Sequence, residues 1–60
     1  MSFKRTIAEV RVGEKIESPK NGNGMIISKT KRTITVLFEK GLKVKNTYRH
    51  SDAYFWESDF

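Results

Sequence analysis

The stretch Thr33-Ile34-Thr35-Val36-Leu37-Phe38-Glu39 decides the fold class, because polar and apolar residues alternate along most of it. In an extended strand successive side chains point to opposite faces, so Ile34, Val36 and Phe38 share one face. Threonine, isoleucine, valine and phenylalanine are also residue types that favour strands. The stretch therefore predicts a β-strand that directs one face into a core.

Segments of the same kind lie on both sides of this strand. Glycines and short polar clusters separate them, which predicts a meander of antiparallel strands joined by turns. The expected segments are a strand over 25–30, a turn at 31–32, a turn at 40–41 and a strand over 43–49. A strongly bent meander closed by a short edge strand makes a small five-stranded barrel, because closure removes exposed strand edges. We therefore expect one all-β domain over residues 1–60.

The N-terminal part of the chain has weaker patterns. Ser18–Gly24 contains proline, two asparagines and two glycines, which suit a tight loop rather than a strand. Before this loop, Ile16 is expected on a strand that follows a turn at Val12-Gly13. Residues 7–12 fit either a strand or a short helical turn, and residues 1–6 are expected to be frayed.

The C-terminal segment brings aromatic residues next to acidic ones. Ser51 is a favourable N-cap, and Asp52 suits the first turn of a helix, where the helix dipole favours negative charge. A single helical turn over 52–56 is therefore predicted, and it would place Phe55 or Trp56 beneath the sheet.

Length and composition require the chain to depend on a compact apolar core. It has 60 residues and no cysteine, so disulfides and thiolate metal sites are excluded. One histidine without clustered carboxylates provides too few ligands for a structural zinc, and no cofactor is expected. Trp56 fits the core and the surface about equally well. The candidate core residues are Ile7, Val10, Val12, Ile16, Ile26, Ile34, Val36, Phe38, Val44, Tyr48, Phe55 and Trp56.

Several of these features together resemble a known family. They are Val12-Gly13, Ile16, Pro19, Gly22-Asn23-Gly24, Ile26, Val36-Leu37-Phe38, Gly41 and the ending Tyr48-Arg49-His50-Ser51-Asp52-Ala53-Tyr54-Phe55. The pattern is similar to the small Tudor/KOW-type SH3-like barrels, which occur as free-standing short proteins, including phage proteins, and on bacterial helicases, nucleases and transcription-repair factors. The resemblance implies a five-stranded SH3-like barrel that binds nucleic acid or docks on a protein such as RNA polymerase. Two positions depart from it, because Ser51 replaces the usual proline and Asn21 stands where an aromatic residue is usual.

Charge is distributed unevenly along the chain, whose net charge is +5. Residues 18–50 hold many lysines and arginines against Glu39 alone, whereas residues 51–60 hold acidic residues and no lysine or arginine. A basic block of this density indicates a polyanionic partner, and a lysine-rich soluble surface is the ordinary alternative.

The predicted nucleic-acid-binding site combines the outward face of the 43–49 strand with the turn before residue 33. Same-face residues on a strand lie about 7 Å apart, so basic side chains there form a rail for a phosphate backbone. The contact residues expected are Lys29, Lys31, Arg32, Lys43, Lys45 and Arg49. Tyr54 and Trp56 are candidates for base stacking if they are exposed. Without such a platform, binding to DNA or RNA is expected to be weak, salt-sensitive and independent of sequence.

A protein-docking module is the competing interpretation. Tyr54, Trp56 and Phe60 would be natural anchors for a protein partner if they are exposed. The partner would be a larger enzyme, such as one of the transcription or replication machinery. A homodimer formed through strand edges is compatible with either function.

An enzyme is not expected. His50, Ser51 and Asp52 are the residue types of a catalytic triad, but adjacent residues point in different directions, whereas a triad needs side chains that converge. No second histidine is present for acid–base catalysis.

A cytoplasmic location is expected. No run approaches the roughly 20 apolar residues of a membrane span. The N-terminal stretch also lacks the continuous apolar region of a secretory signal.

Overall fold

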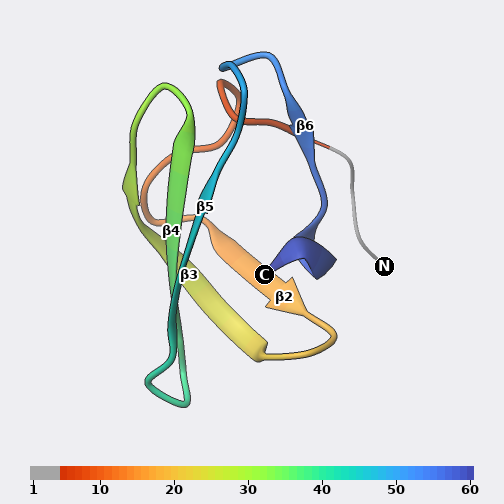
Figure 1. Ribbon diagram of the computed structural model, residues 1–60. Helices are drawn as coiled ribbons and strands as arrows, with labels where there is room; N and C mark the ends of the chain where they lie inside the picture. The colour runs from red at the N-terminus through yellow and green to blue at the C-terminus, as the bar shows by residue number, and fades with distance from the viewer. Residues whose placement is uncertain (1–4) are drawn as a thin grey trace.

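The computed structural model describes residues 5–60 and consists of strands, turns and one short helix. Six strands form two antiparallel sheets, one with the order β2-β3-β4-β5 and one with the order β1-β6 (Figure 1). The elements are β1 (Arg5–Thr6), β2 (Lys15–Ser18), β3 (Gly22–Lys29), β4 (Thr33–Phe38), β5 (Lys43–Thr47), β6 (Tyr54–Phe55) and the 3-10 helix η1 (Glu57–Asp59). The all-β class is confirmed. Over the described residues, however, neither sheet is closed, and six strands replace the expected five.

The strand from which the fold class was predicted, β4, has the expected alternation. Ile34, Val36 and Phe38 are buried, whereas Leu37 between them is 38% exposed. At its start, the Thr30 N–H donates to the Thr33 carbonyl at 2.9 Å, which forms the predicted turn at 31–32. β5 then pairs with β4 and presents Val44 to the core side.

β3 begins earlier than predicted, because the loop expected over 18–24 is only a turn at 19–21. The Ser18 hydroxyl accepts hydrogen bonds from the backbone N–H groups of Lys20 and Asn21, which holds the turn tight. Gly24 is needed inside the strand, because a Cβ there would lie 2.6 Å from the Phe38 ring. The glycines therefore serve close packing in the sheet as well as the turn.

A β-bulge interrupts the pairing of β3 with β4. Ile26 is opposite Val36, but the next paired residue is Ser28, opposite Thr35, so Ile27 is an extra residue in β3. The shift of one residue reverses the faces that follow it. Lys29 therefore lies opposite the buried residue Ile34 and on the core side of the sheet.

The N-terminal segment corrects two expectations. Of the residues expected to be frayed, 1–4 lie outside the described residues, whereas 5 and 6 pair with β6 as strand β1. Residues 7–9 form a turn. Val12 was expected in the core and is 60% exposed. The reason is a bulge in which Gly13, at φ 99°, and Glu14 both pair with Ile26, which leaves Val12 at the tip of a turn.

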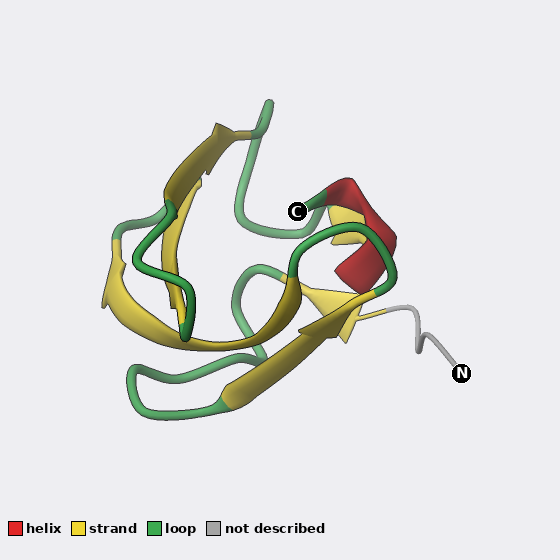
Figure 2. Cartoon of the chain, turned by 90° about the horizontal axis from the view of Figure 1, so that it is seen from below, coloured by secondary structure: helices red, strands yellow, loops and turns green. Residues whose placement is uncertain are grey.

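The helical turn predicted over 52–56 is wrong, because this segment pairs with the N-terminal segment instead. The Ser51 carbonyl accepts a hydrogen bond from the Ala8 N–H at 3.0 Å, and Tyr54 pairs with Thr6 in the small sheet. The single helical turn follows at η1, where the Asp59 carboxylate accepts a hydrogen bond from the Trp56 N–H at 3.0 Å. Figure 2 shows this turn at the C-terminal end of the chain, and it contacts β2.

The two sheets share one core. The Phe55 ring lies 6.1 Å from the Tyr48 ring and 5.9 Å from the Phe60 ring, centroid to centroid. Trp56, left open between core and surface, is 44% exposed. The fully buried residues are Ile7, Val10, Ile16, Ile26, Ile34, Val36, Phe38, Phe55 and Phe60, with Val44 and Tyr48 packed against them. Among the described residues, no helix is long and apolar enough to span a membrane.

Candidate nucleic-acid interface

The side of the large sheet that faces away from the core, here called the outer face, carries ammonium and hydroxyl groups next to one another. Lys43, Lys45 and Thr47 of β5 are exposed, as predicted from their alternation with Val44. Lys45 pairs with Thr35 of β4, and Thr47 pairs with Thr33. Lysine and threonine side chains are both common donors to phosphate oxygens.

One row of residues crosses the outer face from one edge strand to the other, with a lysine at each end. Lys15 of β2 pairs with Met25, Met25 pairs with Leu37, and Leu37 pairs with Lys43, so the four residues form one row across the sheet. Three strand spacings of nearly 5 Å separate the backbones of the outer two residues by about 14 Å. A groove of about 540 Å³ lies along part of this row. Its lining includes Lys15, Met25 and Leu37 and the acidic residues Glu17 and Glu39, whereas Lys43 lies beyond it.

Lys15 was not among the predicted contact residues. Its strand is only four residues long and follows a glycine, so its alternation is too short to stand out in the sequence. The sequence does offer one indication: Lys15 directly precedes Ile16, which is buried, so Lys15 points to the opposite face of the strand.

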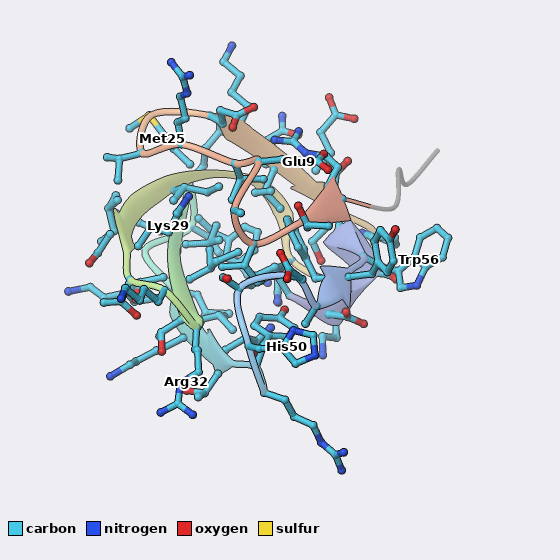
Figure 3. The ribbon with its side chains drawn as sticks, turned by 90° about the horizontal axis from the view of Figure 1, so that it is seen from above. Glu9, Met25, Lys29, Arg32, His50 and Trp56 are labelled. Carbon is cyan, nitrogen blue, oxygen red and sulfur yellow. The ribbon has the colours of Figure 1, made fainter. Side chains whose placement is uncertain are left out.

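The predicted residues Lys31, Arg32 and Arg49 lie together at one end of the β4–β5 pair. The Tyr48 N–H donates to the Arg32 carbonyl at 2.7 Å, which holds the turn at 31–32 beside residues 48–49. All three cations are exposed, and Figure 3 shows that Arg32 projects away from the body of the molecule. They extend the basic outer face beyond the end of β5.

Lys29 does not point to the outer face with the other predicted contact residues. Its ammonium group donates to the Val10 carbonyl at 2.5 Å and lies 3.5 Å from the Ala8 carbonyl. Figure 3 shows Lys29 inside the outline of the ribbon, unlike Arg32. The β-bulge at Ile27 causes this change, because it turns Lys29 toward the core side.

The exposed aromatic residues lie on the other sheet. Tyr54 is 60% exposed, and Trp56 shares its side because buried Phe55 stands between them. Figure 3 shows Trp56 well away from Met25 and Arg32. Phe60 is only 1% exposed, so it does not meet the condition under which it was considered a docking anchor.

Two ionisable groups near these surfaces have perturbed pKa values. Partial burial by itself would raise the pKa of Glu14, but hydrogen bonds from the Arg11 N–H and the Arg5 guanidinium lower it overall. The Arg5 guanidinium lies 2.6 Å from the Glu14 carboxylate, so the charge of Arg5 is paired within the molecule. Burial raises the pKa of Tyr48; the nearby Asn46 amide opposes this shift and the Asp59 carboxylate adds to it.

His50, Ser51 and Asp52 lie in the turn before β6. His50 and Asp52 are exposed, Ser51 is half-buried, and the Ala53 N–H donates to the His50 carbonyl at 3.1 Å. Within residues 5–60, no three histidine, cysteine or acidic side chains are placed to hold a metal ion.

Comparison of the chain with protein-family models, curated proteins and solved structures found no match, so its function has to be argued from its own geometry.

Proposed function

We propose that this chain is a non-catalytic binding module that contacts the backbone of a nucleic acid through the outer face of its large sheet. The observation that carries the proposal is the pairing of lysines with threonines on β4 and β5, namely Lys45 with Thr35 beside Thr47 with Thr33. This set of donors suits phosphate oxygens rather than base edges. Lysines on an edge strand also protect against aggregation, and that alternative predicts no binding.

The proposed site predicts a measurable dependence on salt. Its cations are Lys15, Lys31, Arg32, Lys43, Lys45 and Arg49. Each phosphate contact releases counterions, so three to six contacts with duplex DNA give a log–log salt slope of about −3 to −5. Binding should therefore be clear at low salt, weak at physiological salt and nearly independent of sequence.

Charge reversal on β5 tests the proposal. Lys45→Glu should weaken binding of labelled DNA by about tenfold at low salt, because it removes one phosphate contact and adds repulsion. Lys20→Glu is the matched control, since Lys20 is exposed in the turn at 19–21, outside the outer face. Fluorescence anisotropy measures both. Equal losses for the two variants, or no binding by the parent chain at low salt, would contradict the proposal.

We also propose that the two sheets together make an SH3-like barrel of the Tudor/KOW type. Two features support it: the pairing of β1 with β6, and the packing of Phe55 from the small sheet on Tyr48 beside β5. An experimental structure by NMR tests it through distances between the rings of these two residues. A small sheet that is detached from the large one would contradict it.

A second candidate function is docking on a larger protein of nucleic-acid metabolism. The observation in its favour is the exposure of Tyr54 and Trp56 on one side of β6. Docking predicts that Trp56→Ala abolishes capture of the partner from cell extract, with and without nuclease, while Lys45→Glu does not. Light scattering would detect a homodimer, whose pairing through β5 would bring Lys43 and Lys45 of two copies together unfavourably.

A further inference from the structure

We infer that the nucleic acid bound by the outer face is a duplex, contacted on both of its backbones, rather than a single strand with stacked bases. This inference rests on the proposed function and specifies its ligand. Three features of the outer face carry it: the position of Lys15, the chemistry of the side chains between the cations, and the position of the acidic residues.

The first feature is that cations stand at both ends of one row across the large sheet. Lys15 belongs to the edge strand β2, and Lys43 and Lys45 belong to the opposite edge strand β5. Measured along the sheet, the backbones of Lys15 and Lys43 are separated by about 14 Å across the row that contains Met25 and Leu37. The grooves of duplex DNA are about 6 Å and 12 Å wide, so two backbones that border one groove are separated by a comparable distance. A single strand has one backbone and would engage only one of the two sides.

The second feature is the chemistry between the cations. The outward residues of the central strands that lie there are Met25, Leu37 and Thr35, none of which has a ring. Recognition of single strands relies on aromatic side chains on which bases stack, worth about 1–3 kcal/mol per base. The exposed rings of Tyr54 and Trp56 belong to the other sheet or follow it directly. The outer face thus has the donors for phosphates and lacks a platform for bases among its described residues.

The third feature limits where the duplex lies. Glu17 pairs with Asn23, and the Glu39 N–H donates to the Asn23 carbonyl, so both acidic residues line the groove at its end away from Arg32. Their charge repels phosphates from that end. At the other end of β4 and β5 are Arg32 and Arg49, with no acidic residue between Thr33 and Phe38 or between Lys43 and Arg49. The contacted backbones therefore lie from the Lys15 row toward Arg32 and Arg49.

The decisive variant is Lys15→Glu, measured by fluorescence anisotropy at low salt against a short labelled single strand and the duplex formed with its complement. We expect the parent to bind the duplex more tightly than the single strand. Lys15→Glu should weaken duplex binding about fivefold and single-strand binding less than about twofold, because only the duplex has a second backbone. Lys20→Glu is the control for net charge, and Lys15→Gln together with circular dichroism checks that folding is retained.

The outcomes separate this inference from the proposed function. Equal weakening of both ligands by Lys15→Glu, or tighter binding of the single strand that is lost in Trp56→Ala, would overturn the duplex assignment while nucleic-acid binding stands. The proposed function itself would be overturned if Lys45→Glu bound both ligands as tightly as the parent does, or if the parent bound neither ligand. Binding of an acidic protein at the same lysines with no DNA binding would overturn both.

Discussion

The large sheet and the C-terminal segment Tyr54–Phe60 are held in place in different ways. In the large sheet, three strand pairings each extend over at least four residues, and alternate side chains enter the core. The C-terminal segment has one pairing of two residues and one helical turn. Its position depends on single contacts with distant residues. The Glu57 carboxylate accepts a hydrogen bond from the Glu17 N–H at 2.6 Å, and the Asn46 amide donates to the Asp59 carbonyl at 3.1 Å.

The difference shows how each region obtains its register. A strand with alternating residues specifies which face is buried, because a slip by one residue would expose every apolar side chain. The C-terminal segment has no single period, since Phe55 and Phe60 are buried while Trp56 between them is exposed. Asn21 also binds the Phe60 carbonyl through its side-chain amide. The position of the C-terminal segment is therefore set by its contacts with distant residues. The following variants test this difference from the large sheet.

The largest expected effect is that of Phe60→Ala, which removes the ring that fastens the C-terminal segment. Truncation of a buried phenylalanine costs about 3–5 kcal/mol, which approaches the whole stability of a domain this small. Urea denaturation followed by circular dichroism measures it. Trp56→Ala is the control and should cost less, because Trp56 is 44% exposed whereas Phe60 is 1% exposed. Similar costs for the two variants would show that Phe60 does not hold the segment.

In the large sheet, Gly24→Ala should have the next largest effect. The new Cβ would lie 2.6 Å from Cδ1 of Phe38 and 2.8 Å from Cγ1 of Val36, so the core must shift. Overpacking of this kind costs about 1–3 kcal/mol. Asn23→Ala is the neighbouring control, because the Asn23 side chain is exposed. A thermal melt that is equal for both variants would mean that β3 does not pack on Phe38 at this position.

Lys29→Met tests the residue that the bulge moves from the outer face. Its loss leaves the Val10 carbonyl without the ammonium donor, which should cost about 1–2 kcal/mol. DNA binding should stay within about twofold of the parent, since Lys29 is not on the outer face. Lys45→Met should behave in the opposite way, with stability kept and binding weakened. A strong loss of DNA binding in Lys29→Met would show that Lys29 does contact the nucleic acid.

The smallest expected effect is a dependence of stability on pH that comes from Glu14. The pKa of Glu14 is lowered from its ordinary value of 4.5 in the folded chain, so ionised Glu14 stabilises the fold above about pH 4.5. This contribution is lost as the pH falls through the lowered pKa. Glu14→Gln should therefore reduce stability at neutral pH and flatten its decline in acid. The effect is small because the ion pair with Arg5 is partly exposed.

The predicted site residues show the same difference between positions set by a strand's own alternation and positions set by contacts with distant segments. Lys43 and Lys45 were placed correctly on the outer face, because the alternation of their own strand determines it. Lys29 was misplaced because a bulge depends on the partner strand and leaves no mark in the local pattern. Lys15 was missed because its position opposite Met25 depends on a pairing between separate segments.

The sequence by itself determined the all-β class, the β3–β4–β5 meander, the inward faces of Ile34, Val36 and Phe38, and the basic character of β5. These follow from alternation and turn residues, which act between near neighbours in the chain. Only the tertiary structure decided that Phe60 is buried and Val12 exposed, that Lys29 turns inward, and that Lys15 and Lys43 end one row across the outer face. Each of these depends on which distant segments meet, and a single strand's periodicity does not contain that information.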